Sequence, residues 1–163
     1  MDKGFPLLLV NLLATWFLAG LIWMVQLVHY PLFARVGAPE WQAFHTEHMR
    51  MITVIIAPMM FIEALSAAAL VFVAREYPPQ ARLCVWIAAA LVLSNWLVTA
   101  GVAVPLHNRL GEGLDVAVVD RLVAVNWLRT AGWTLRGLLL AFVTWKVVQA
   151  IPRASSASGP LSA

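Results

Sequence analysis

Four apolar stretches, each long enough to cross a membrane, place the strongest limit on how this 163-residue chain can fold. They cover residues 5–28, 51–73, 83–106 and 128–149. A helix needs about 20 apolar residues to cross roughly 30 Å of hydrocarbon, and each stretch reaches that length. The sequence therefore predicts an all-α integral membrane protein built as a bundle of four transmembrane helices.

The composition agrees with a membrane protein and excludes a soluble domain. With 62% hydrophobic and 12% charged residues, the chain has too little polar surface to cover a soluble domain of this size. Its eleven lysines and arginines are scattered and form no basic patch, so we expect the lipid bilayer and not nucleic acid as a partner. Residues 1–151 are predicted to form one domain, and residues 152–163 a disordered tail.

All four histidines fall on one side of the membrane when the crossings are counted. They are His29, His45, His48 and His107, and each follows or precedes an apolar stretch. Lysines and arginines near the helix ends are slightly more numerous on the opposite side, which holds both termini. We therefore expect a bacterial inner-membrane protein with cytoplasmic termini and a functional site at the histidine face.

Short interfacial helices are predicted at this face. Residues 40–50 follow the helix-start signal of Pro39 and lead into the second span. Residues 115–126 have apolar residues at helical spacing and are expected to lie along the interface.

The motif His45-Thr46-Glu47-His48 is the clearest local signal for chemistry. Two imidazoles three residues apart share one helix face, which suits coordination of copper, iron or zinc. His29 and His107 can supply further ligands from the same membrane face. A transition metal is therefore the predicted cofactor. Two alternatives stay open: contact with lipid headgroups, and a metal-free acid-base or substrate-binding role.

The end of the first span adds Gln26 and Tyr30 to His29. Their spacing of i, i+3, i+4 predicts that all three side chains point into the bundle. The Gln26 amide and the Tyr30 hydroxyl are suitable partners for a histidine or a substrate, which makes them candidate substrate-binding and catalytic residues. Capping and headgroup contact are the alternative roles.

Glu63 lies near the middle of the second span, where a carboxylate is costly unless it is paired or protonated. It is about 22 Å along the helix from His48, too far to share a metal. Asn95 and Arg136 come at a similar depth and are candidate partners. We expect this cluster to fix helix packing, and the alternative is a catalytic Glu63 in a proton or substrate relay.

The fourth span carries a polar stripe of Asn126, Arg129, Trp133 and Arg136. Steps of 3, 4 and 3 residues place them on one face, which we expect to line an internal wall. Asn126 and Arg129 are candidate catalytic residues, and Trp133, Arg136 and Asn95 candidate substrate-binding residues. Such a wall of donors suits an anionic, quinone-like or oxygenated ligand.

Residues 104–110 (VPLHNRL) and 126–130 (NWLRT) resemble the second half of the anthrone-oxygenase-like family of small four-helix membrane proteins. The resemblance covers residues 83–142 and does not include the histidine motif of residues 45–48. The matching positions are Asn108, Asn126, Arg129 and Thr130. It implies a four-helix fold, a substrate-binding Asn108 and oxidation of an aromatic or similarly apolar small molecule.

These observations leave three functional hypotheses. The first is a membrane oxidoreductase or oxygenase that acts on a small lipophilic molecule with a histidine-bound metal. The second is a non-catalytic metal-binding or ligand-binding protein. The third is a structural or accessory subunit whose polar stripe packs against a larger membrane complex. The predicted protein partner is a second copy of this chain in a homo-oligomer or the other subunits of such a complex. The first two need the same ligands, so the sequence does not separate them.

Overall fold

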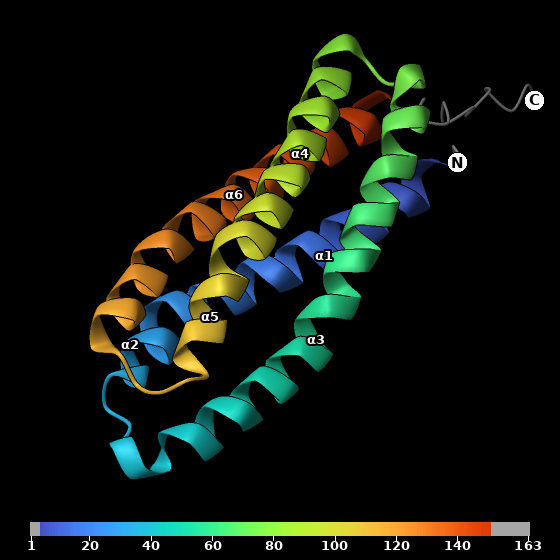
Figure 1. The fold of residues 1–163 in the computed structure, drawn as a ribbon. Coiled ribbons are helices and arrows are strands. Elements are labelled where there is room, and N and C mark those ends of the chain that lie inside the picture. The colour runs from blue at the N-terminus through green and yellow to red at the C-terminus, as the bar shows by residue number, and fades with distance from the viewer. Residues whose placement is uncertain (1–3, 151–163) are drawn as a thin grey trace, which may run out of the picture.

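The computed structural model describes residues 4–150, which form four long helical segments (Figure 1). They cover Gly4–Phe33, Ala38–Glu76, Pro79–Leu110 and Val116–Ala150, and each is long and apolar enough to cross a membrane. The described part of the chain contains no β-strand. The predicted all-α multi-pass membrane protein is therefore confirmed. The predicted tail, residues 152–163, lies outside the described residues.

Two of the four segments contain a π-helical turn. The elements are α1 (Gly4–Met24), the π-helical η1 (Val25–His29) and α2 (Tyr30–Phe33) in the first segment; α3 (Ala38–Val73) and the 3-10 turn η2 (Ala74–Glu76) in the second; α4 (Pro79–Val98), the π-helical η3 (Thr99–Ala103) and α5 (Val104–Leu110) in the third; and α6 (Val116–Ala150) in the fourth.

Only one of the two predicted interfacial segments has the expected structure. Residues 40–50 are helical and continuous with the second span, as predicted. The prediction of a separate interfacial helix over residues 115–126 is wrong, because α6 runs without a break from Val116 to Ala150. Asp115 caps its start by accepting hydrogen bonds from two backbone amides of the first turn, at 2.9 and 3.3 Å. The 35 residues of α6 span roughly 52 Å, so the helix extends well beyond the hydrocarbon layer.

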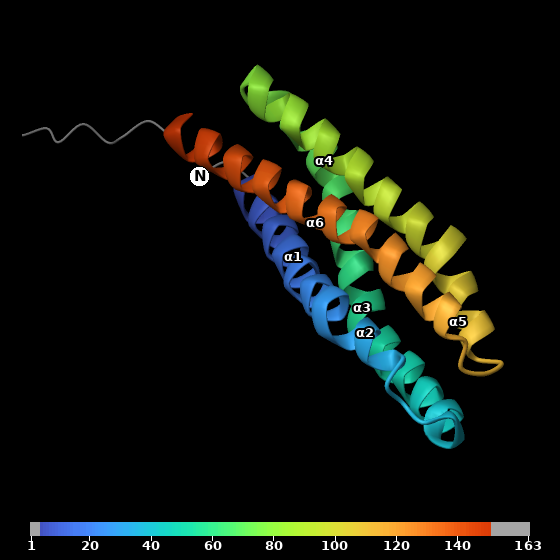
Figure 2. The same ribbon diagram turned by 90° about the vertical axis from the view of Figure 1, so that its left-hand side faces the viewer.

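Helix α6 organises the bundle. It packs along α1 on one side and α4 on the other, and Figure 2 shows it lying between them. One apolar core lies near the start of α1 and the end of α6 and includes Leu8, Leu70, Leu140 and Val143. A second core lies toward the histidines and includes Leu18, Ile22, Phe33, Trp41 and Leu122. Large apolar side chains such as Leu13 and Leu65 face outward and are 69% and 70% exposed, as expected of a surface in contact with lipid.

Among the four long helices α1, α3, α4 and α6, the neighbours α3 and α4 have the least contact. They touch over a shorter stretch than α4 and α6 do. Figure 1 shows α3 diverging from α4 and α5 toward the end of the bundle that holds α2. The candidate site lies in this region.

Candidate functional site

Each of the two π-helical turns leads directly into an element that carries site residues. The turn η1 ends at His29 and is followed by Tyr30 on α2, and η3 is followed by α5, which carries His107. Both α2 and α5 have a proline in the first turn, Pro31 and Pro105. A proline lacks the N–H that an α-helix needs and its ring crowds the carbonyl four residues earlier, which favours a wider turn just before it.

The four histidines meet at this end of the bundle. His29 Nε2 lies 2.8 Å from His48 Nδ1, and His45 Nε2 lies 3.4 Å from His107 Nδ1. The ring centres of His45 and His107 are 5.6 Å apart, those of His48 and His107 5.6 Å, and those of His45 and His48 6.3 Å. The predicted convergence of the HxxH pair with His29 and His107 is confirmed.

We call His29, His45, His48 and His107 the histidine cluster. Aromatic side chains pack against it. The fully buried Phe33 ring contacts all four imidazoles. Trp41 stacks on His45 at 5.3 Å between ring centres and donates a hydrogen bond from Nε1 to the Leu110 carbonyl at 2.7 Å. His45, His48 and His107 are themselves buried. Headgroup contact therefore does not explain these three side chains.

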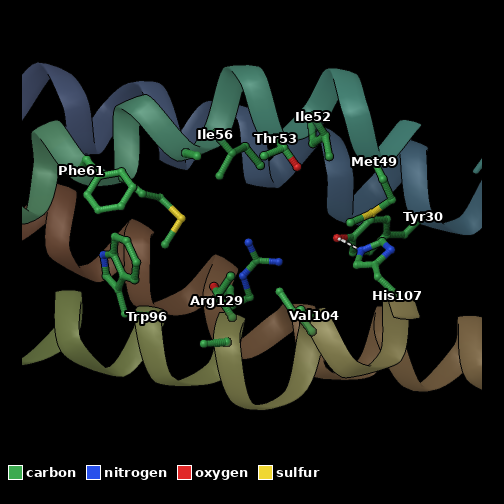
Figure 3. A pocket seen from close by; sticks show the side chains of 15 residues that line it. Tyr30, Met49, Ile52, Thr53, Ile56, Phe61, Trp96, Val104, His107 and Arg129 are labelled. Atoms are coloured by element: carbon green, nitrogen blue, oxygen red, sulfur yellow. Dashed lines mark hydrogen bonds between the residues drawn. The ribbon is translucent and has the colours of Figure 1, made fainter. Parts of the chain in front are cut away.

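A cavity of about 280 Å³ lies beside the cluster, between α3 and the segment formed by α4, η3 and α5. Most of its lining is apolar, and Figure 3 shows Phe61 and Trp96 at one end and Tyr30 with His107 at the other. The Tyr30 hydroxyl and His107 Nε2 are 2.9 Å apart and join the cavity to the histidine cluster.

Arg129 points into the middle of this cavity (Figure 3). Its side chain is 3% exposed, and its Nη1 donates to Asn126 Oδ1 at 3.1 Å. The guanidinium lies over the Trp133 ring at 5.3 Å. Its Nε atom is buried and has no hydrogen-bond partner. No ion pair neutralises Arg129 within residues 4–150.

Gln26 and Asn126 hold Arg129 in place and do not line the cavity. Asn126 Nδ2 donates to Gln26 Oε1 at 2.8 Å, and Gln26 Nε2 donates to the Val123 carbonyl at 3.2 Å. This chain of hydrogen bonds fixes the Asn126 oxygen that Arg129 contacts. Neither side chain lines the cavity, so their contacts favour positioning of Arg129. The substrate-binding role of Gln26 and the catalytic role of Asn126 stay predictions.

Glu63 and Arg136 form a separate polar network deeper in the bundle. Arg136 Nε donates to Glu63 Oε1 at 2.9 Å, and both side chains are buried. Thr15 Oγ1 donates to the same oxygen at 2.9 Å, and Trp133 Nε1 to Glu63 Oε2 at 3.1 Å. The other two guanidinium nitrogens of Arg136 donate to the Ala88 carbonyl at 3.1 Å and to an asparagine oxygen of α1 at 2.7 Å. The predicted pairing of Glu63 with Arg136 is confirmed.

This network is internally satisfied and lies outside the cavity lining. Glu63, Trp133 and Arg136 use their polar atoms on one another and on α1 and α4, which favours the packing role over a catalytic or substrate-binding one. Asn95 is not a partner of Glu63 in this arrangement. It is buried beside Gly132, and its Nδ2 atom has no hydrogen-bond partner.

Asn108 lies on the exposed face of α5 and does not line the cavity. Its predicted substrate-binding role therefore has no support. The neighbouring residue His107 is buried and lines the cavity instead. Sequence reasoning also missed Asn11 and Thr15 of the Glu63 network. Both are polar residues four apart in an otherwise apolar span, a spacing that could have identified them.

The chain was compared with protein-family models, with curated proteins and with solved structures, and none of them matches it. The resemblance to the anthrone-oxygenase-like family stays a prediction. Three of the four positions that carry it, Asn126, Arg129 and Thr130, are buried in α6.

Proposed function

We propose that this protein binds a small lipophilic molecule inside the bilayer, places an oxygen atom of that molecule on Arg129, and acts on it as an oxidoreductase. The observation that carries the proposal is the buried Arg129 guanidinium, which reaches an apolar cavity and has no counter-ion within residues 4–150. A buried cation is costly unless something compensates its charge, and a ligand oxygen provides that compensation.

The shape and chemistry of the cavity define the ligand class. Its volume of about 280 Å³ is just below the usual range of roughly 300–1,000 Å³ for small-molecule sites, which favours a small ligand. Apolar walls suit a hydrocarbon or aromatic body, while the donors of Arg129 suit a quinone carbonyl, a phenolate or a carboxylate. Arg129 favours an anionic or carbonyl oxygen over a cation, which it would repel.

The redox part of the proposal is supported by the groups at one end of the cavity. Tyr30 and His107 are hydrogen-bonded to each other and line the cavity together with Arg129. They can move a proton to or from a bound oxygen as it gains or loses electrons. The electrons themselves require a redox-active partner, a metal ion or a second substrate.

The two alternatives to an enzyme make different demands on the arginines. An accessory subunit would be favoured by arginines that face lipid, and Arg129 and Arg136 are both buried. A non-catalytic binding protein uses the cavity in the same way as an enzyme. Turnover of the bound molecule separates these two possibilities.

The test compares three probes of similar size: a short-chain benzoquinone, the corresponding phenol, and a hydrocarbon without oxygen. Binding to the detergent-purified protein is followed by quenching of tryptophan fluorescence, since Trp96 lines the cavity. We expect Arg129→Gln to weaken binding of the oxygenated probe that binds best by roughly 10- to 100-fold, the equivalent of one hydrogen bond to a charged group. The hydrocarbon should be unaffected.

Arg121→Gln is the matched control, because Arg121 is on the same helix but exposed. It should bind the probes as the wild-type protein does. Equal affinity of the wild-type protein for all three probes would contradict the proposal, as would an Arg129→Gln variant that binds like the wild type.

A further inference from the structure

Three of the histidines are spaced like the ligands of one metal ion. Around a tetrahedral ion with metal–nitrogen bonds of ~2.0 to 2.1 Å, neighbouring imidazole ring centres are roughly 5.2 Å apart. The ring centres of His45, His48 and His107 are separated by 5.6, 5.6 and 6.3 Å. The set is therefore only slightly wider than a liganded one.

The nitrogen atoms support the same arrangement. Two donors on a tetrahedral ion are ~3.3 Å apart, and His45 Nε2 and His107 Nδ1 are 3.4 Å apart. His48 Nε2 is buried and has no hydrogen-bond partner. As the side chains stand, no three His, Cys, Asp or Glu residues within residues 4–150 complete a metal-binding group. The third ligand therefore requires a turn of the His48 ring toward the other two.

From this geometry we infer that His45 Nε2, His48 Nε2 and His107 Nδ1 form a three-histidine site for a transition-metal ion. The site goes beyond ligand binding at Arg129 and does not depend on it. Three imidazoles with an open fourth position suit Cu²⁺ or Zn²⁺, whereas Mg²⁺ and Ca²⁺ prefer oxygen ligands.

The outer nitrogens of two proposed ligands already have partners. His29 Nε2 lies 2.8 Å from His48 Nδ1, and the Tyr30 hydroxyl lies 2.9 Å from His107 Nε2. Metal-bound histidines are normally held in this way, because a hydrogen bond on the outer nitrogen fixes the tautomer and the ring orientation. His29 and Tyr30 are accordingly positioning residues, and Tyr30 connects the metal site to the cavity.

The first experiment measures metal binding by the wild-type protein without any organic ligand. The detergent-purified protein is stripped with a chelator and dialysed against Cu²⁺, Zn²⁺ or Mg²⁺, and the bound metal is measured by mass spectrometry. We expect about one Cu²⁺ or Zn²⁺ per chain and no retained Mg²⁺. Loading with Co²⁺ should give the visible absorption bands of a four-coordinate, nitrogen-ligated ion.

The second experiment assigns the ligands. His48→Gln and His107→Gln should lose the bound metal, and His29→Gln should keep it with roughly 10- to 100-fold weaker affinity. Glu47→Gln is the matched control, because Glu47 lies between the two ligands of α3 and its side chain is exposed. Circular dichroism and size-exclusion chromatography check that each variant is folded.

A wild-type protein that retains no transition metal would overturn the inference, and so would folded His48→Gln and His107→Gln variants that still bind it. If those variants do not fold, the Co²⁺ spectrum of the wild-type protein decides the question through the presence or absence of nitrogen-ligand bands. Binding of the benzoquinone probe is measured on metal-free protein, so that failure of the metal site and failure of the Arg129 site are distinguishable.

Discussion

Replacing Glu63 by glutamine should destabilise the protein far more than the same replacement at Glu47. Glu63 is buried and accepts three hydrogen bonds, from Thr15, Trp133 and Arg136. Glu47 pairs with Arg50 one helical turn away at 2.6 Å, but both of these side chains are more than half exposed. The two substitutions are chemically identical, so the comparison isolates the effect of burial.

The magnitude follows from what a glutamine can accept at position 63. If its oxygen keeps the contacts with Thr15 and Arg136, its amide nitrogen faces the Trp133 N–H, and two donors then oppose each other. The Arg136 charge also loses its counter-ion, and arginine cannot give up its proton. Removing one partner of a buried ion pair costs about 3–5 kcal/mol, whereas exposed pairs often contribute nothing measurable.

The assay is unfolding of the detergent-purified protein by increasing mole fractions of sodium dodecyl sulfate, followed by far-ultraviolet circular dichroism. Glu63→Gln should shift the midpoint to a markedly lower mole fraction or prevent isolation of a folded protein, while Glu47→Gln should match the wild type. A folded Glu63→Gln protein with the wild-type midpoint would refute the argument that this ion pair holds α3 to α6.

Two further predictions concern α6. Gly132→Ala should lower the stability by about 1–3 kcal/mol because an added Cβ would overlap Asn95 Oδ1, while Gly20→Ala, where a Cβ meets open space, should not lower the melting temperature. In the same unfolding assay, Arg136→Ala should lower the free energy of unfolding by about 3–5 kcal/mol and Arg129→Ala by clearly less, because only Arg136 compensates a buried carboxylate. A larger loss for Arg129→Ala than for Arg136→Ala would show that the two arginines have been assigned the wrong roles.

The fold was predictable because lipid imposes a simple rule on the sequence. Every backbone polar group in the hydrocarbon must be satisfied within its own helix, so four apolar stretches can only form four helices. The pairing of Glu63 with Arg136 was predictable from depth alone, since each charge needs a partner at its own level in the bilayer. The convergence of the histidines followed in the same way from counting crossings.

The cavity and the roles of its neighbours were not predictable by these arguments. Residues that face lipid and residues that face another helix are equally apolar, so the divergence of α3 from α4 leaves no clear pattern in the sequence. Residues 115–126 have apolar residues at helical spacing, which suggested a separate interfacial helix, but α6 is continuous from Val116 to Ala150. The depth argument also grouped Asn95 with Glu63, although Asn95 packs beside Gly132 in the structure.

The π-helical turn Val25–His29 gives the first segment two separate angular phases. One extra residue in a turn rotates everything after it by about 100° around the helix axis. Leu18 and Ile22 precede the turn and Tyr30 and Phe33 follow it, and all four are buried in the same apolar core. A single helical wheel drawn through the whole segment would therefore misplace one of the two groups. Deleting one residue from the turn would leave Leu18 and Ile22 in place and rotate Tyr30 and Phe33 away from the histidine cluster.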